Sequence, residues 1–329
     1  GLVNIHTHPT SEPLNKGVME EAGSPRLGMS ALYEFMTAMR PDEDARRAAA
    51  QFAMAEMVRS GVTSFCDFTL PRQDWVEDIA ASGLRGWVCP AFRAARWEAR
   101  NGHAVDFHWD IAAGREALAA TLDIVDRARA HPSGRIGAMV GPQQSDTCGE
   151  ELLCAAAEAA RARGIPVHTH AGFALVEFNE ITRRTGLTPI GWLDRIGFLG
   201  PDAILAHCIF VDEYPWVKWW EKRDVERLAS SRATVVHCPT VYARRGMVMN
   251  SFGSYLKRGV RLAIATDTFP HDMIDEMRWA VVLSRVMDGS LLSANVSDVF
   301  HAATIGAADA LGRPDLGRIE AQAQADIAL

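Results

Sequence analysis

The sequence has no long apolar run, no excess of basic residues and no dense set of cysteines. Its longest apolar stretches, such as residues 203–210, are strand-sized and fall short of the roughly 18 to 20 residues that a membrane span needs. The formal net charge is −7 and no basic tail is present, which argues against binding to nucleic acid, because phosphates attract Lys and Arg. With 329 residues, 48% of them hydrophobic and 23% charged, the composition is that of a globular protein with one large or two modest domains.

The six cysteines are too few for a disulfide framework in a chain of this length. Cys66, Cys89, Cys208 and Cys238 lie inside apolar, strand-like runs, where we expect reduced thiols packed in a core. No secretory signal pattern is present, so we expect a cytoplasmic location. The sequence starts at Gly1, inside a predicted strand and without an initiator Met, and we expect the natural termini to lie beyond it.

Short β-branched apolar runs alternate with longer amphipathic segments along the whole chain. This rhythm is typical of βα units that build a parallel sheet. The expected strands are residues 2–5, 62–68, 86–90, 136–140, 165–168, 203–206, 234–237 and 262–265. The expected helices between them are residues 42–60, 116–130, 150–163, 214–230 and 272–287.

Eight strands in this length of chain predict an α/β fold of the (β/α)8 barrel type, which usually takes about 250 residues. The competing architecture is a doubly wound open sheet, but no Gly-x-Gly-x-x-Gly follows the first strand. Residues 93–110, rich in Arg, Trp and His, form a long insertion after the third strand. Loops at the carboxyl ends of barrel strands usually shape a substrate pocket, and we expect the same of this insertion.

Polar residues that can bind metals follow the apolar runs at the strand ends. His6 and His8 are two residues apart at the end of the first strand, so both imidazoles point to the same face. The other such residues are, in order of the strands that they end, His168 and His170, His207, His237 and Asp267. Buried, hydrogen-bonded histidines would be the purely structural explanation. His6, His8, His170 and Asp267 together instead supply the N and O donors of a zinc site, although iron or manganese would also suit them.

The motifs around these residues resemble those of the amidohydrolase superfamily. They are Gly-Leu-Val-Asn-Ile-His-Thr-His from residue 1, His-Thr-His from 168, Ala-His-Cys from 206, Val-Val-His-Cys-Pro-Thr from 235 and Ala-Thr-Asp from 265. Within the superfamily, the chain is most similar to the branch of cytosine, guanine and adenosine-derivative deaminases and triazine hydrolases. The resemblance implies a barrel over residues 1–315 and, over 316–329, the start of a return into a small β-sandwich that family members build from both chain ends.

By the same resemblance, His6, His8, His170 and Asp267 would hold the metal and His207 would face the metal-activated water and the substrate. His168 would lie one layer deeper in a structural role, and His237 would pack beside the site or contact one of the ligands rather than bind the metal itself. Members with two metals commonly bridge them with a modified lysine after the fourth strand. No lysine is found there, where the sequence reads Ile-Gly-Ala-Met-Val-Gly-Pro-Gln-Gln. We therefore expect one divalent metal, Zn²⁺ with Fe²⁺ or Mn²⁺ as alternatives, and a substrate contact from Gln143.

The resemblance implies hydrolysis of a C–N bond, with deamination of an aminated cyclic small molecule as the main expectation. Asp267 would take a proton from the water and pass it to the leaving group, and His207 would stabilise the oxyanion. One residue departs from the family pattern: Phe173 stands where the deaminases have the Glu that protonates a ring nitrogen, and Glu177 matches only an ordinary helix Glu. This departure keeps two alternatives open, namely hydrolysis of an amide or of a chloro- or alkylamino-triazine, and a barrel that binds a small ligand without catalysis.

The remaining candidates follow the strands that open into the barrel mouth. As substrate contacts we expect Gln143, Phe173, His207, Arg93 and His271. Weaker candidates of the same kind are Glu12, Asn15, Lys16, Arg96, Tyr242, Arg244, Arg245, Trp97, Trp109 and Phe269. Arginines can clamp a polar or carboxylate substrate and flat aromatic rings can stack on it. We expect a small-molecule substrate, no nucleic-acid or membrane partner, and a homo-oligomer as in other members of the family.

Overall fold

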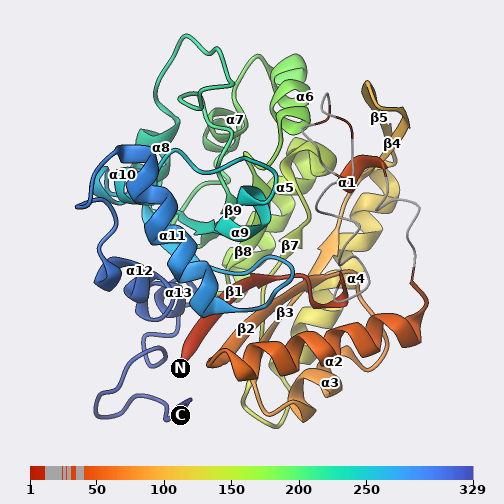
Figure 1. Ribbon diagram of the computed structural model, residues 1–329. Coiled ribbons are helices and arrows are strands. Elements are labelled where there is room, and N and C mark those ends of the chain that lie inside the picture. Colours follow the sequence, from red (N-terminus) through yellow and green to blue (C-terminus); the bar gives the residue numbers. More distant parts are fainter. Residues whose placement is uncertain (12–23, 25–26, 28–30, 35–40, 329) are drawn as a thin grey trace.

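The computed structural model describes residues 1–11, 24, 27, 31–34 and 41–328, and its strands lie at the centre with helices around them (Figure 1). One parallel sheet contains β1 (Leu2–Thr7), β2 (Val62–Thr69), β3 (Arg85–Phe92), β6 (Ile136–Ala138) and β7 (Gly141–Pro142). The other contains β8 (Val167–Ala171), β9 (Ala203–His207), β10 (Thr234–His237) and β11 (Arg261–Ile264). Both β6 and β7 pair with β3 and form two segments of one interrupted strand. The two sheets therefore supply the eight strands of the expected barrel.

Isolated parallel bridges join the two sheets at both seams. Thr7 pairs with Asp267 at one seam, and Val140 pairs with Val167 and Gln144 with His170 at the other. These bridges connect the first strand to the last and the fourth to the fifth. Because these bridges join the two sheets at both seams, the predicted (β/α)8 barrel is confirmed.

Helices follow the strands and cover the outside of the barrel. The longer ones are α2 (Glu43–Arg59), α4 (Ile111–Arg129), α5 (Ser145–Arg163), α6 (Leu175–Thr185) and α11 (Met273–Asp288). The shorter ones are α1 (Ala31–Glu34), α3 (Trp75–Ala81), α7 (Pro189–Arg195), α8 (Asp224–Ser231), α9 (Pro239–Ala243), α10 (Phe252–Lys257), α12 (Val296–Ala302) and α13 (Ile305–Ala310), and one 3-10 turn spans Pro9–Ser11. No described helix combines the length and the apolar composition that crossing a membrane requires.

Aspartate caps explain where several of these helices begin. The carboxylate of Asp42 accepts a hydrogen bond from the backbone N–H of Ala45, and Asp110 accepts one from Ala113. Each bond satisfies one of the N–H groups that the first turn of a helix leaves without a partner. The start of α2 was therefore predicted within one residue, whereas α4 begins at Ile111, five residues before the predicted start.

The predicted helix over residues 214–230 is wrong for its first half, because only α8 is helical. Two buried carboxylates close the preceding loop: that of Asp212 accepts hydrogen bonds from the N–H groups of Arg223 and Asp224, and that of Asp224 accepts one from the N–H of Asp212. Inside the loop, the ring of Tyr214 packs 4.8 Å from that of Phe210. These tertiary contacts override the helical pattern of the local sequence.

The insertion after the third strand is a β-hairpin. Its strands β4 (Ala95–Asn101) and β5 (Ala104–Trp109) are antiparallel and pair with each other, apart from the barrel (Figure 1). Asn101-Gly102 stands at the turn, a dipeptide that favours tight hairpin turns. The hairpin was identifiable in the sequence from this dipeptide.

The two ends of the chain lie side by side (Figure 1). The amino group of Gly1 donates to the carbonyl of Asp326 over 2.7 Å, and the Asp326 carboxylate pairs with Arg85 over 2.8 Å. Residues 316–328 contain neither helix nor strand. The return into a β-sandwich over residues 316–329 stays a prediction.

Candidate active site

Four strand ends bring their predicted ligands to one point. Oδ1 of Asp267 lies 3.3 Å from Nε2 of His6 and 3.2 Å from Nε2 of His8. Nε2 of His8 in turn lies 3.1 Å from Nε2 of His170. Nε2 of His207 lies 4.0 Å from the other carboxylate oxygen of Asp267. We call these five residues the upper cluster.

Backbone pairing between the first and last strands holds Asp267 in place. Its N–H donates to the carbonyl of His6 over 2.9 Å, and its own carbonyl accepts from the N–H of His8 over 2.7 Å. Next to it, the side chain of Asn4 forms two hydrogen bonds with Thr266, one to its hydroxyl and one from its N–H. Asn4 was not predicted as a site residue. The signal was a polar amide in the middle of an otherwise apolar strand.

Two residues of the upper cluster have left-handed backbone conformations. The φ angle is 60° at Asp267 and 83° at His207. Residues other than glycine rarely adopt positive φ, at a cost of about 1–3 kcal/mol each. The surrounding fold maintains this strain where the two side chains meet, as is common at functional sites.

Backbone carbonyls fix the orientation of two imidazoles. Nδ1 of His8 lies 2.5 Å from the carbonyl of Phe68, and Nδ1 of His170 lies 2.5 Å from the carbonyl of Gln143. In both rings Nδ1 is therefore the donor, and Nε2 presents its lone pair to the centre of the cluster. Metal-binding histidines usually have such a partner on the nitrogen that does not bind the ion.

The charges and burial of the upper cluster fit a divalent cation. Burial alone would raise the pKa of Asp267, but the imidazoles of His6 and His8 outweigh it and hold that pKa well below its usual range. Burial and the neighbouring imidazoles lower the pKa of His170 well below the ordinary histidine value, whereas at His8 the carboxylate of Asp267 outweighs burial and raises the pKa. An ionised carboxylate and neutral imidazoles are the protonation states that bind metals.

Both ring nitrogens of the buried His6 lack a hydrogen-bond partner of good geometry in the described structure, and a cation would supply a partner for Nε2. Among the described residues, Nδ1 of His6 has no hydrogen-bond partner, and Nε2 has none of good geometry although Asp267 is near. Such an imidazole is costly in a protein interior. His6, His170, His207 and Asp267 each offer one ligand atom, and these atoms lie within 4.8 Å of one another.

His207 is enclosed by rings from neighbouring strands. The ring of Tyr242 lies 4.9 Å from that of His207, and its hydroxyl donates to the carbonyl of Phe173 over 3.0 Å. Burial lowers the pKa of His207 to about 3. The ring is therefore neutral near pH 7 and able to donate a single N–H.

Phe173 packs beside the upper cluster, and its ring lies 6.1 Å from that of His170. It also belongs to a small apolar cluster with Leu27, Tyr33 and Trp97. Glu177, which we expected to be an ordinary helix residue, is fully buried. Its carboxylate accepts hydrogen bonds from the N–H groups of Gly172 and Phe173, which fixes the turn after β8.

The other predicted substrate contacts differ in where they lie relative to the upper cluster. Gln143 orients His170 through its backbone, while its buried Oε1 has no hydrogen-bond partner in the described part of the chain. The guanidinium of Arg93 lies 6.0 Å from the ring of Trp97. His271 is fully buried, with Nδ1 2.8 Å from the hydroxyl of Thr266. The structure brings Gln143 next to the upper cluster and places His271 behind Thr266.

The weaker candidates for substrate contact also lie in different surroundings. Arg184 covers the ring of Trp109 on the surface, and Arg244 covers that of the buried Phe269, while Arg96 is exposed on the hairpin. Glu12, Asn15 and Lys16 lie outside the described residues.

Arg245 differs from these arginines in its neighbours. Burial lowers the pKa of its guanidinium, and the phenol of Tyr242 and the carboxylate of Asp267 act in the opposite direction. Its charge in turn contributes to lowering the pKa of His207. Within the described residues its side chain forms no ion pair or hydrogen bond. Arg245 is thus a cation beside the upper cluster that has no protein partner there.

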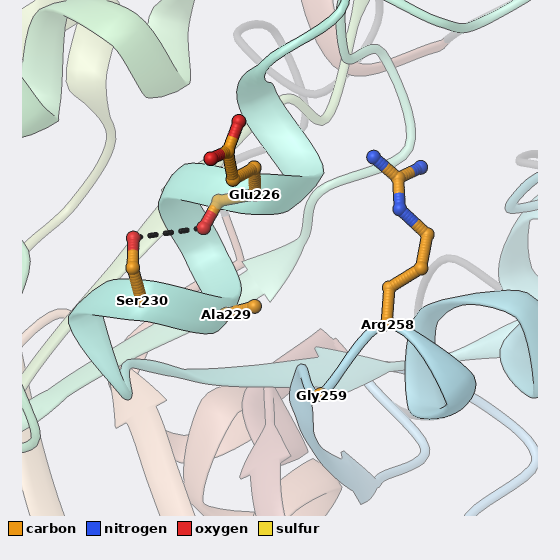
Figure 2. A pocket seen from close by; sticks show the side chains of 5 residues that line it. All are labelled: Glu226, Ala229, Ser230, Arg258 and Gly259. Atoms are coloured by element: carbon orange, nitrogen blue, oxygen red, sulfur yellow. Dashed lines mark hydrogen bonds between the residues drawn. The ribbon is translucent and has the colours of Figure 1, made fainter.

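A surface hollow lies at the opposite end of the barrel (Figure 2). It is lined by Glu226, Ala229 and Ser230 of α8 and by Arg258 and Gly259, which precede β11. These residues lead into the amino ends of β10 and β11, whereas the upper cluster lies at carboxyl ends. The hollow is therefore separate from the candidate active site.

Comparisons with known proteins agree with this geometry. The family model described as "Amidohydrolase family" matches residues 1–329. A 5-methylthioadenosine/S-adenosylhomocysteine deaminase from Halobacterium salinarum is 31% identical over 100% of this chain and 72% of its own length. The solved structure of an adenosine deaminase from Xanthomonas campestris with bound zinc superposes with a TM-score of 0.81 at 24% identity, covering 99% of this chain and 70% of that one. An atrazine chlorohydrolase from Arthrobacter aurescens TC1, complexed with zinc, gives a TM-score of 0.78 at 18% identity, over 96% and 72% of the two chains.

Proposed function

Because the chain belongs to the amidohydrolase family, we propose that it deaminates an aminated heterocycle hydrolytically, with one divalent metal held by His6, His8, His170 and Asp267. The observation that carries the proposal is the convergence of these side chains, with Asp267 3.3 Å from His6 and 3.2 Å from His8. The donor set of three imidazoles and one carboxylate suits zinc. Zinc is also the ion named for the similar deaminase from Xanthomonas campestris.

The imidazoles and the carboxylate named above would hold a divalent cation, which when bound would supply a nucleophilic water near neutral pH. Asp267 is the base that accepts the proton of this water, because its carboxylate is ionised and lies at the centre of the upper cluster. The same carboxyl group then delivers the proton to the departing amine. A single residue thus serves both proton transfers.

His207 stabilises the oxygen that gains negative charge when water attacks the ring carbon. Its imidazole is neutral and buried, so an N–H from it meets the developing charge without competition from solvent. Tyr242 packs against this ring and holds its orientation. His207 contributes to the reaction without being required to hold the metal.

The surroundings of the upper cluster favour a flat substrate with a polar or anionic substituent. Phe173 provides an apolar wall where the deaminases of the family have an acid, and Arg245 provides a cation that has no ion-pair or hydrogen-bond partner among the described residues. Phe173 is also the observation that favours a second candidate function. Without the acid that protonates a ring nitrogen, the site suits a chlorotriazine, whose chloride leaves unprotonated, or an amide or alkylaminotriazine, whose leaving amine takes its proton from Asp267.

A release assay distinguishes these functions. The zinc-loaded protein is incubated with a panel of aminated purines, pyrimidines and triazines, and ammonia is measured, with amides and chlorotriazines followed in parallel. We expect ammonia from at least one aminated heterocycle, and none from the same substrate with Asp267→Asn. Release of chloride or alkylamine alone would support the second function, and the absence of any turnover would favour a barrel that only binds ligands.

A further inference from the structure

A second group of metal-binding side chains lies inside the barrel beneath the upper cluster. Cys66 of β2, Cys89 of β3 and His168 of β8 are each fully buried. Each offers one ligand atom, and the three atoms lie within 4.8 Å of one another. The thioether of Met139 is also close, with its sulfur 3.9 Å from that of Cys66. We call these four residues the lower cluster.

The strand register explains why these side chains meet. Cys66 pairs with Trp87 and Phe68 pairs with Cys89, so Cys66 and Cys89 share one face of neighbouring strands at a diagonal. His168 precedes His170 by two residues and therefore points into the same interior, one layer deeper. Its Nδ1 lies 3.9 Å from the sulfur of Cys66, and its ring lies 4.8 Å from that of His6.

A disulfide between the two cysteines does not fit this register. A diagonal offset of two residues places the Cα atoms roughly 8 Å apart, from a rise of about 3.3 Å per residue and a strand spacing of about 4.8 Å. Disulfides require Cα atoms within roughly 7 Å. The sulfur atoms themselves are near enough to share an ion, because two metal–sulfur bonds of about 2.3 Å span the gap that one S–S bond does not.

A catalytic thiol does not fit either. Cys89 is fully buried, and this burial raises the pKa of its thiol well above the ordinary value. Reactive cysteines instead have lowered pKa values and lie within reach of solvent. Simple core packing leaves the imidazole of His168 poorly satisfied, since its Nε2 has no hydrogen-bond partner among the described residues and its Nδ1 has only a distant thiol.

We propose that Cys66, Cys89 and His168, with the thioether of Met139 beside them, form a second metal site that selects a soft divalent cation such as Cd²⁺. Thiolate and thioether donors prefer soft ions, whereas the imidazoles and carboxylate of the upper cluster suit borderline ones. A divalent ion with two thiolates is electrically neutral, which keeps the cost of burying charge low. Two S–H bonds break, two metal–sulfur bonds form, and two protons pass to the solvent.

Cadmium titration of the zinc-loaded protein tests this proposal. Ultraviolet absorption by cadmium–thiolate bonds reports the lower cluster, because the upper cluster contains no sulfur. We expect the signal to saturate at about one Cd²⁺ per chain, with about two protons released per ion and the bound zinc retained. This readout needs no enzymatic activity, so it stands apart from the proposed function.

Matched variants locate the site. Cys66→Ser and Cys89→Ser should each abolish most of the absorption, whereas Cys148→Ser, which changes a buried thiol outside the lower cluster, should leave it intact. Met139→Leu preserves the volume of the core and should weaken binding about tenfold, which keeps the proposal testable if a serine variant does not fold. Absorption that survives in both serine variants, or no thiolate signal in the unmodified protein, would overturn the proposal.

Discussion

The two ends of the barrel differ in how their polar side chains are hydrogen-bonded. At the amino end, in the hollow of Figure 2, the hydroxyl of Ser230 donates to the carbonyl of Glu226 and the guanidinium of Arg258 pairs with Glu213 over 2.8 Å. At the carboxyl end, His6 has a buried nitrogen with no partner in the described structure. Polar groups that satisfy one another need no ligand. The buried upper cluster is therefore a better candidate for the active site than the open hollow.

The largest expected effect comes from removing a ligand at the carboxyl end. His6→Ala and Asp267→Ala should each lower kcat by about 10⁴-fold or more, because the nucleophilic water depends on the cation that these side chains hold. Metal content should fall together with activity. The measurement is turnover on the substrate found by the release assay, alongside elemental analysis of the purified variants. Unchanged turnover in either variant would refute its assigned role.

A smaller effect on kcat is expected from changing His207, which lies at the carboxyl end of the barrel and assists the reaction without holding the metal. His207→Asn should lower kcat by about 10²–10³-fold, the usual cost of losing one donor to a developing oxyanion. Metal content should stay at its original value, which separates this variant from those of the ligands. A parallel loss of metal would show that His207 is itself a ligand.

Phe173→Glu tests the departure from the family pattern. The new carboxyl would lie near that of Glu177, which accepts a hydrogen bond from the N–H of Phe173 and whose pKa burial raises to about 8. We expect a lower melting temperature and a change of about tenfold or more in the ratio of kcat/KM between ring substrates. Phe173→Leu, which adds no charge, should leave that ratio within about twofold. Identical ratios in the parent and the Glu variant would place Phe173 outside the pocket.

The smallest expected effect is on KM, and it should differ between two arginines at opposite ends of the barrel. Arg245→Met should raise KM for an anionic substrate by about tenfold, which corresponds to one lost charge-assisted hydrogen bond, and should leave metal content unchanged. Arg258→Met, in the hollow of Figure 2, should change neither KM nor kcat by more than about twofold. Equal effects of the two substitutions would contradict the difference between the ends.

The sequence predicted the barrel and the residues of the upper cluster because both depend on local periodicity. His6 and His8 share a face wherever they are placed on a strand, and parallel strands necessarily bring their carboxyl ends together. The loop before α8 was not predictable in this way. Its helical pattern was overridden by Asp212 and Asp224, which satisfy each other's backbone N–H groups only after folding.

The other features that the sequence did not predict depend on contacts between strands that are distant in the sequence. The sequence indicated that Cys66 and Cys89 would be core thiols, and both are buried. It gave no sign that His168 would join them, because that contact depends on the register between β2 and β3 and on the width of the barrel interior. Gln143 was expected to touch substrate, yet its backbone carbonyl proves to orient His170. Backbone roles of this kind leave no trace in residue type.

The most direct test of the account is a crystal structure of the protein grown with one equivalent of zinc, with anomalous diffraction recorded at the zinc absorption edge. We expect one dominant peak at about 2.0–2.2 Å from Nε2 of His6, His8 and His170 and from a carboxylate oxygen of Asp267. A dominant peak at any other place, or two equal peaks within the upper cluster, would contradict a catalytic centre built on a single cation.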